Sequence, residues 1–352
     1  MAGAEVLTVE DGARWREALP ASESVFGSVE YARIQERHGG GAPRLFTLAV
    51  PGGSIAYPIV LRPVGELEFA DRAAEGLFDA ATPQYTGPFA PADLDADARE
   101  AFQAALSRWC RESRVVTEFG HLQPWRARTE LLEGSALERD REIVYVDLTD
   151  DPERLWRDSY THAARKNVNR ARREGVRVRT AAGGAGAREL HRIYEQTMDR
   201  QRARRSYYFP PSFFEAFVEE LPDNSRIVVA EHGGRAVAAT LYLHDDTDVY
   251  SYLGGADHDH RHLRPTNAVV DETIRWAREE GKQRLVLGGG YRPGDGIFRF
   301  KASFSPLRAE LRLYRRVHLP DEYASLRDAW SARHGAATPD YFPPYRATPT
   351  PG

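Results

Sequence analysis

The alternation of helical and strand patterns after residue 187 is the feature that most constrains how this chain folds. Apolar residues recur at helical spacing over residues 187–204, 211–220 and 266–280. Two turns, His232-Gly-Gly and Asp245-Asp-Thr-Asp, separate three strand-like segments between the second and third of these helices. The predicted strands are residues 226–231, 236–244, 249–254, 284–288 and 310–314. This order predicts an α/β domain over residues 151–316, with a mixed sheet flanked by helices.

The segment that precedes residue 187 predicts further elements of the same domain. A helical pattern covers residues 152–174, with a bend or interruption, and is expected to end at Gly175 because glycine readily forms a left-handed C-cap. A strand over residues 176–180 and a flexible turn over residues 181–186 follow.

Residues 1–150 show a compatible but less distinct α/β pattern. The clearest signal is a β-hairpin, in which residues 44–50 and 55–61 flank a Pro-Gly-Gly-Ser turn. Other helices are predicted at 11–19, 31–36 (capped by Ser28) and 93–111, and other strands at 115–122 and 143–148. We expect one domain over residues 1–150, a second over 151–316, and a C-terminal helix and Pro-rich tail over 317–352.

Composition excludes several classes of protein. No run approaches the roughly eighteen apolar residues of a membrane span, and the acidic first ten residues lack the pattern of a signal peptide. The one cysteine, Cys110, lies in a helical run and is predicted to be a buried thiol, so neither a disulfide nor a thiolate metal cluster is expected. A cytoplasmic location fits these features.

Charge is unevenly distributed along the chain. Residues 1–150 hold 15 Lys/Arg and 25 Asp/Glu, whereas residues 151–316 hold 30 and 23. The basic half should attract an anionic partner such as RNA or a phosphorylated cofactor. Its cations gather on a helical segment and again just before Tyr207-Tyr-Phe209. The candidate nucleic-acid-binding residues are Arg165, Lys166, Arg170, Arg172, Arg173 and Arg204. A solvated charged face is the alternative.

A glycine-rich segment between residues 288 and 304 is the strongest candidate for chemistry. An apolar strand leads into Gly288-Gly-Gly-Tyr-Arg-Pro-Gly-Asp-Gly, and a short helical run with Phe300, Lys301 and Phe304 follows. Glycines let a ligand approach the backbone closely. A lysine held between two aromatic walls would stabilise an oxyanion that develops when an amine attacks an ester or thioester. A loop with a solvated lysine is the alternative.

Other motifs point to no cofactor and no metal. His258, His260 and His262 alternate, but no matching ligands are found in register elsewhere, so this segment is predicted to be a polar connection. The sequence lacks a P-loop, a dinucleotide fingerprint and a Gly-x-Ser-x-Gly elbow. The remaining candidates are therefore transfer reactions or binding.

Taken together, these segments resemble the Fem-type aminoacyl-tRNA-dependent aminoacyltransferases, a family built of two GNAT-like domains. The similar segments are Leu155-Trp156 with the basic residues 165–175, Tyr194-Glu-Gln-Thr-Met-Asp-Arg200, Tyr250-Ser-Tyr-Leu-Gly254, and Gly288-Gly-Gly with Phe300-Lys301-Ala-Ser-Phe304. In the first half, Tyr85-Thr-Gly-Pro88 is similar to the family's acceptor loop. Two departures are the lack of a coiled-coil arm and Ser305 where a glycine often follows the second Phe.

The resemblance implies a reaction and a set of partners. An amino acid would pass from aminoacyl-tRNA, a co-substrate in place of any cofactor, to the amine of a peptide-type acceptor in cell-wall or antibiotic biosynthesis. DNA is not an expected partner. Lys301 would take the oxyanion or tRNA-end role, and the implied substrate-binding residues are Tyr85, Arg200, Tyr252, Phe300 and Phe304.

Two rival functions are a CoA-dependent GNAT-like N-acyltransferase and a non-catalytic RNA-binding protein. A CoA pyrophosphate site needs free backbone amides at a Gly-rich helix start. The matching stretch, Arg261-His-Leu-Arg-Pro-Thr-Asn267, has no glycine, and Pro265 removes one donor. This composition disfavours CoA.

Asp295 is the nearest carboxylate to the predicted catalytic lysine and is a candidate general base. A helix cap or a solvated loop position is the alternative role for Asp295. A relay through the hydroxyl next to the ester would need no protein base.

Overall fold

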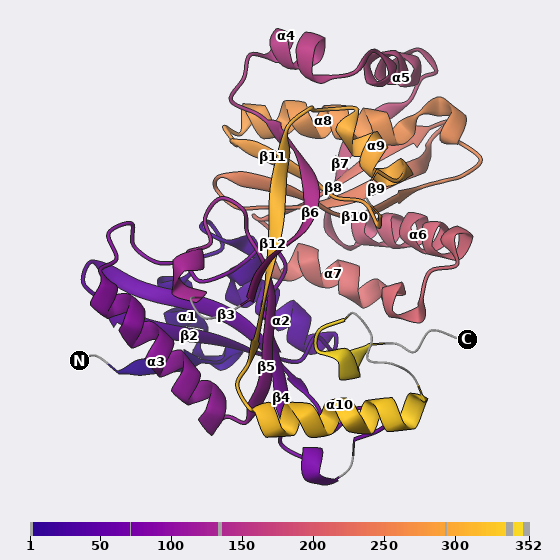
Figure 1. Ribbon diagram of the computed structural model, residues 1–352. Coiled ribbons are helices and arrows are strands. Elements are labelled where there is room, and N and C mark those ends of the chain that lie inside the picture. The colour runs from indigo at the N-terminus through magenta and orange to yellow at the C-terminus, as the bar shows by residue number, and fades with distance from the viewer. Residues whose placement is uncertain (1–2, 71, 133–135, 293, 336–340, 348–352) are drawn as a thin grey trace. The chain divides into compact units, whose positions relative to one another are not determined.

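The computed structural model describes residues 3–70, 72–132, 136–292, 294–335 and 341–347 (Figure 1). The chain forms two compact units. Unit 1 comprises Met1–Pro20, Phe26–Asp140 and Leu311–Gly352, and unit 2 comprises Ala21–Val25 and Arg141–Glu310. The predicted division of function between residues 1–150 and residues 151–316 stays a prediction.

Unit 1 is built on strands in the order β1-β2-β3-β4-β5-β12. The predicted hairpin is confirmed, because β2 and β3 pair antiparallel from Ala42↔Leu61 to Val50↔Gly53. Only the β4–β5 pair is parallel within this order. The strands are β1 (Ala4–Leu7), β2 (Ala42–Val50), β3 (Gly53–Pro63), β4 (Phe78–Ala81), β5 (Val115–Leu122) and β12 (Arg308–Val317).

The helices of unit 1 begin at polar caps that the sequence predicts in part. The Ser28 hydroxyl accepts from the Tyr31 N–H at the start of α2, and the Asp95 side chain caps α3. Cys110 on α3 is buried, as predicted. The helices are α1 (Gly12–Ala18), α2 (Val29–Arg37), α3 (Ala96–Glu112) and α10 (Pro320–His334), with short helical turns η1 (Val9–Asp11), η2 (Val25–Gly27), η3 (Arg72–Ala74), η4 (Thr129–Leu132) and η8 (Pro344–Arg346).

Unit 2 is built on strands in the order β6-β11-β10-β9-β8-β7. The predicted three-strand meander is confirmed as β8, β9 and β10, which pair antiparallel. Strand β11 then lies parallel to β10 and antiparallel to β6. The strands are β6 (Ala136–Asp147), β7 (Arg177–Ala181), β8 (Ser225–His232), β9 (Arg235–His244), β10 (Asp248–Ala256) and β11 (Arg284–Gly288).

The helices of unit 2 cover both faces of its strands. Figure 1 shows α8 on one face and α6 and α7 on the other. The predicted interruption of residues 152–174 is confirmed as a π-helical turn, η5, between α4 and α5. The helices are α4 (Pro152–Arg154), η5 (Leu155–Ser159), α5 (His162–Arg173), α6 (Gly183–Gln201), η6 (Arg205–Tyr207), α7 (Pro211–Glu220), η7 (Arg261–Leu263), α8 (Pro265–Glu279) and α9 (Gly296–Ala302).

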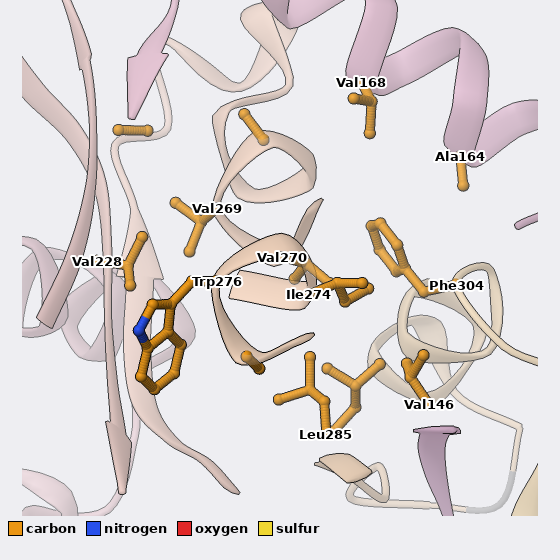
Figure 2. Packing of buried hydrophobic residues seen from close by; sticks show 14 of the residues in the cluster. Val146, Ala164, Val168, Val228, Val269, Val270, Ile274, Trp276, Leu285 and Phe304 are labelled. Carbon is orange, nitrogen blue, oxygen red and sulfur yellow. The ribbon is translucent and has the colours of Figure 1, made fainter. Parts of the chain in front are cut away.

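The main core of unit 2 lies between α5, α8 and the strands. Figure 2 shows Val270 and Ile274 of α8 facing Val168 of α5 and Phe304. Phe304 lies just after the end of α9. These side chains are buried within one cluster. The core therefore holds the segment that carries Lys301 against the helices at one side of the unit.

One predicted turn is wrong. Residues 183–186 are not a flexible turn, because α6 begins at Gly183 and includes them. A Cβ on Gly186 would lie 2.7 Å from the Cβ of Ala181, so glycine here lets the first turn of α6 pack directly on the end of β7. The predicted helix end at Arg204 is also too late, since α6 ends at Gln201 and Arg202 is left-handed.

The predicted fold class, mixed α/β with strands flanked by helices, is confirmed. Strands β1 and β4 and the first half of β6 were not predicted from the sequence. Within the described residues, no helix is both long and apolar enough to span a membrane.

Candidate functional site

Strands β10 and β11 are paired over only part of their length. The candidate site lies beyond the last paired residues, Tyr250 and Val286. Their parallel register runs from Asp248↔Arg284 to Tyr250↔Val286. Strand β10 continues to Ala256, with an irregularity in its pairing to β9 between Ser251 and Leu253. A bulge of this kind re-aims side chains and frees backbone groups. Tyr252, a predicted substrate-binding residue, lies at this irregularity.

The loop that follows β11 is organised by one carboxylate. Asp295 is the N-cap of α9: its Oδ1 accepts from the Phe298 N–H at 2.7 Å, and its Oδ2 accepts from the N–H groups of Tyr291 (2.7 Å) and Arg292 (3.1 Å). These backbone bonds, the Phe298 bond first, lower the pKa of Asp295. A carboxylate stabilised in this way is a poor proton acceptor. The geometry favours the capping role of Asp295. Its role as a general base stays a prediction.

Lys301 lies on α9 and points back to the glycine turn. Its Nζ donates to the Gly289 carbonyl oxygen at 2.7 Å. Burial lowers its pKa from 10.5 to about 8, while the nearby Asp295 carboxylate raises it. The ammonium group therefore carries its charge at neutral pH with little surrounding water, and it keeps further N–H donors. Such a group stabilises a developing oxyanion more strongly than a solvated lysine does.

The two phenylalanines beside Lys301 have different environments. Phe304 is fully buried and meets the ring of Tyr160 edge-on at 5.2 Å. Phe300 is only partly buried and packs on Phe304 at 5.4 Å between ring centroids. Phe304 thus anchors α9 in the core, a packing role that its burial favours over the predicted substrate contact. Phe300 remains the aromatic candidate for the site wall.

Four tyrosines gather near this loop. The Tyr194 hydroxyl on α6 donates to the Tyr207 carbonyl oxygen at 2.9 Å. Burial and then the neighbouring Tyr291, Tyr252 and Tyr207 raise the pKa of Tyr194. Tyr291 is 63% exposed and Tyr207 is 43% exposed. Of these four, only Tyr252 is a predicted substrate-binding residue, because it is folding that brings the tyrosines together.

A cleft of about 390 Å³ in unit 2 contains Arg200, a predicted substrate-binding residue. The Arg200 guanidinium donates to the Ala256 carbonyl oxygen at 3.3 Å. Arg235 lies 3.6 Å from Asp257 across the same cleft. The lining mixes cations and carboxylates and includes Gln196, His258 and Asp259. This composition suits a polar ligand that carries charges of both signs.

The predicted RNA-binding cations fall into two groups. Arg165 donates to the carbonyl oxygens of Trp156, Arg157 and Tyr160, and Arg172 pairs with Asp271 at 2.7 Å. These two side chains hold α5 and η5 in place. Arg170 lies 3.8 Å from Glu174. Within the described part of the chain, the exposed Lys166, Arg173 and Arg204 have no ion-pair partner.

Tyr85, the predicted acceptor-binding residue of unit 1, is buried and has a left-handed φ of 52°. Its ring packs against Phe26 at 5.8 Å. A non-glycine residue in this conformation is held by its surroundings. Its contact with an acceptor stays a prediction.

The start of α8 offers few backbone donors. Arg264 has a left-handed φ of 61°, Pro265 has no N–H, and the Asn267 N–H donates to the Arg264 carbonyl oxygen at 3.1 Å. A phosphate group at this helix start would find these amides absent or already bonded.

Comparison with known proteins defines the class. Residues 159–302 match the family model described as an acetyltransferase (GNAT) domain. This segment of the chain is therefore similar to GNAT acetyltransferase domains. The predicted resemblance to Fem-type, GNAT-like proteins is confirmed at the level of the fold, because the chain is similar to the solved structure of FemX: the TM-score is 0.70 at 11% identity, over 92% of this chain and 99% of that one.

Two other solved structures share the fold. The C-terminal domain of a putative lysylphosphatidylglycerol synthetase from Agrobacterium fabrum has a TM-score of 0.57 at 14% identity, covering 90% of this chain and 96% of that one. A tandem GNAT protein from the clavulanic acid biosynthesis pathway has a TM-score of 0.50 at 13% identity, covering 90% and 98%. No curated protein matches the sequence. At these identities the likeness establishes the fold alone.

Proposed function

We propose that this chain moves an amino acid from aminoacyl-tRNA to the amine of a peptide or peptide-bearing small molecule. The amine nitrogen attacks the ester carbonyl carbon, a C–N bond forms, and the C–O bond to the terminal ribose breaks. The proton lost by the amine ends on the ribose oxygen, so the products are an amide and free tRNA. The observation that carries this proposal is the position and environment of Lys301.

Lys301 supplies positive charge where the ester oxygen becomes negative. Its Nζ is held by the Gly289 carbonyl oxygen at 2.7 Å, so the group is oriented before substrate binds. Preorganised charge of this kind stabilises a transition state without a cost of reorganisation. Phe300 at one side would limit the access of water to the ester.

No protein base is assigned to the proposed step. The Asp295 carboxylate accepts hydrogen bonds from three backbone N–H groups, and its lowered pKa makes it a weak base. A route through the neighbouring ribose hydroxyl relays the proton from the amine to the leaving oxygen. With the proton relayed in this way, Asp295 has the role of fixing the loop that carries Tyr291.

Two features favour tRNA over CoA as the acyl donor. The start of α8, where a CoA pyrophosphate would need free amides, has Pro265 and an already bonded Asn267 N–H. Exposed cations on α5 and before η6, namely Lys166, Arg173 and Arg204, are available to phosphates. Arg200, Tyr252 and Tyr85 are the proposed acceptor-binding residues. Because charged tRNA is a cytoplasmic molecule, this reaction would take place there.

The test is transfer by the purified chain to a panel of peptide acceptors, with labelled aminoacyl-tRNA or acetyl-CoA as donor. We expect product with aminoacyl-tRNA and loss of product after ribonuclease treatment of the donor. Product from acetyl-CoA that is indifferent to ribonuclease would instead establish the second candidate, a CoA-dependent N-acyltransferase, which the GNAT family match favours. Binding of tRNA without transfer to any acceptor would leave the RNA-binding alternative.

A further inference from the structure

A cluster of buried polar side chains lies inside unit 1 and has no part in the proposed reaction. Glu118 of β5 is 1% exposed, and its Oε1 accepts from the hydroxyls of Tyr57 (2.6 Å) and Tyr314 (2.8 Å). Its Oε2 lies 2.8 Å from Nε2 of His318, which is 8% exposed. The two tyrosine hydroxyls also contact each other. Five polar side chains thus converge in the core, the fifth being Cys110.

Cys110 brings a sulfur ligand to the same point. It lies on α3 and is fully buried. The Cys110 sulfur, a Glu118 carboxylate oxygen and a His318 ring nitrogen all lie within 4.8 Å of one another. Cys110 and Glu118 come from the consecutive elements α3 and β5, and His318 comes from the segment after β12, far along the chain.

The chemistry of this set matches that of a zinc-type cation. Thiolate, imidazole and carboxylate are the three protein ligands that zinc prefers. Two negative ligands would neutralise a divalent cation, so the loaded site would add no net charge to the core. Hydrogen bonds from Tyr57 and Tyr314 would orient the Glu118 carboxylate, as groups behind a metal ligand commonly do.

The alternative is a metal-free network in which His318 and Glu118 pair and the thiol is a bystander. In that state, burial and the nearby Glu118 carboxylate raise the pKa of the Cys110 thiol well above its usual value. The thiol then holds its proton, and among the residues that the structure describes no hydrogen bond to the Cys110 sulfur is found. A cation would give each of the three groups a function, at the cost of that proton.

We propose that Cys110, Glu118 and His318 bind one zinc-type divalent cation as a structural site in the core of unit 1. A water molecule or one of the two tyrosine oxygens would complete four-coordination. The site is independent of the proposed acyl transfer, because none of its residues belongs to the groups assigned to that reaction.

The test measures metal content in the full-length, tag-free chain. The protein is equilibrated with Zn²⁺ and then treated with a weak chelator, which removes the zinc that surface histidines hold. The zinc that remains bound is measured by mass spectrometry. We expect about one zinc per chain, and at least a tenfold lower affinity in Cys110→Ala and His318→Gln. The matched control is Leu106→Ala, which truncates a fully buried side chain of the same helix and leaves all three proposed ligands in place.

A second readout guards against variants that fail to fold. The unaltered chain, loaded with Co²⁺ in place of Zn²⁺, should show the near-ultraviolet band that reports a cobalt–thiolate bond. Zinc-free wild-type protein after equilibration, or the absence of that band in a cobalt-loaded chain, would overturn the proposal. Full zinc retention by a folded Cys110→Ala variant would overturn it as well.

Discussion

Lysine is rare in this chain, and that rarity bears on the role of Lys301. Of 48 basic residues only Lys166, Lys282 and Lys301 are lysines, and the rest are arginines. Arginine stays charged at any ordinary pH, whereas a buried lysine adjusts its pKa readily and acts as a compact point charge. Burial lowers the pKa of Lys301 to about 8, close to neutral pH, whereas an arginine at this position would keep its charge. The residue choice itself is therefore informative at this position.

Replacement of Lys301 tests its proposed charge role. We expect Lys301→Ala to lower kcat for transfer by roughly 100- to 1,000-fold, the loss typical for one oxyanion donor, with little change in tRNA affinity. The matched control is Lys282→Ala, because the Lys282 Nζ also donates to a backbone carbonyl oxygen, that of Asp245, at 2.7 Å. A wild-type rate in Lys301→Ala would remove Lys301 from the mechanism.

The lowered pKa of Lys301 predicts how stability depends on pH. Below about pH 8 the lysine is charged in both folded and unfolded chains, so the folded state bears the full cost of burying the charge. Between about 8 and 10.5 the folded lysine loses its proton first, and this cost is relieved. The free energy of unfolding of the wild type, relative to Lys301→Met, should therefore rise over that range in denaturant titrations. A difference that does not vary with pH would contradict the lowered pKa.

At the scale of elements, α9 depends on one cap. Asp295 accepts from Phe298, Tyr291 and Arg292, so it joins the helix to the loop before it. A Cβ on Gly290 would overlap the Asp295 carboxylate, which explains why a glycine is needed next to this cap. The element is short, and its position relies on this cap and on Phe304 in the core.

Two substitutions separate the capping role of Asp295 from a role as general base. Asparagine can still cap the Phe298 N–H through its one amide oxygen, but its amide nitrogen cannot accept from Tyr291 and Arg292, and it cannot act as a base. We expect Asp295→Asn to keep more transfer activity than Asp295→Ala, which should lose about 1 kcal/mol of stability and reduce kcat by disordering the loop. Single-turnover rates and thermal unfolding would measure the two effects. An inactive but fully stable Asp295→Asn variant would restore the base assignment.

At the scale of the whole molecule, positive charge is concentrated in residues 151–316, which hold 30 Lys/Arg against 23 Asp/Glu. Folding divides these cations by role. Arg165 and Arg172 are engaged with η5 and Asp271, while Lys166 and Arg173 are exposed. Only the second group is free to meet phosphates.

This division predicts opposite effects of substitutions on the same helix. The double variant Lys166→Ala/Arg173→Ala should weaken tRNA binding and reduce the slope of log affinity against log salt by about 1 to 2, with stability unchanged. Arg165→Ala should instead lower the unfolding temperature, because three carbonyl oxygens lose a shared donor. Salt-dependent binding and thermal unfolding would measure both. Equal losses of affinity in the two variants would contradict the division.

Local sequence patterns predict most of the helices and strands and the order in which they follow. Strand β11, helix α7, the meander and the interrupted basic helix are predicted because periodicity, caps and turns are local properties of neighbouring residues. The same locality explains the error at residues 183–186: glycines that normally mark a turn serve here for close packing on β7, which is a contact between segments.

Which side chains meet depends on how distant segments pack, and it becomes visible with the fold. Folding places Lys301 on the Gly289 carbonyl oxygen, Phe304 in the core, and Tyr207, Tyr252 and Tyr291 near Tyr194. Folding also brings Cys110 close to Glu118 and His318. The sequence does not reveal this set, because His318 lies far from the other two residues along the chain. Such sets depend on packing between distant segments and on the burial that shifts a pKa. The spacing of residues along the chain predicts neither this packing nor this burial.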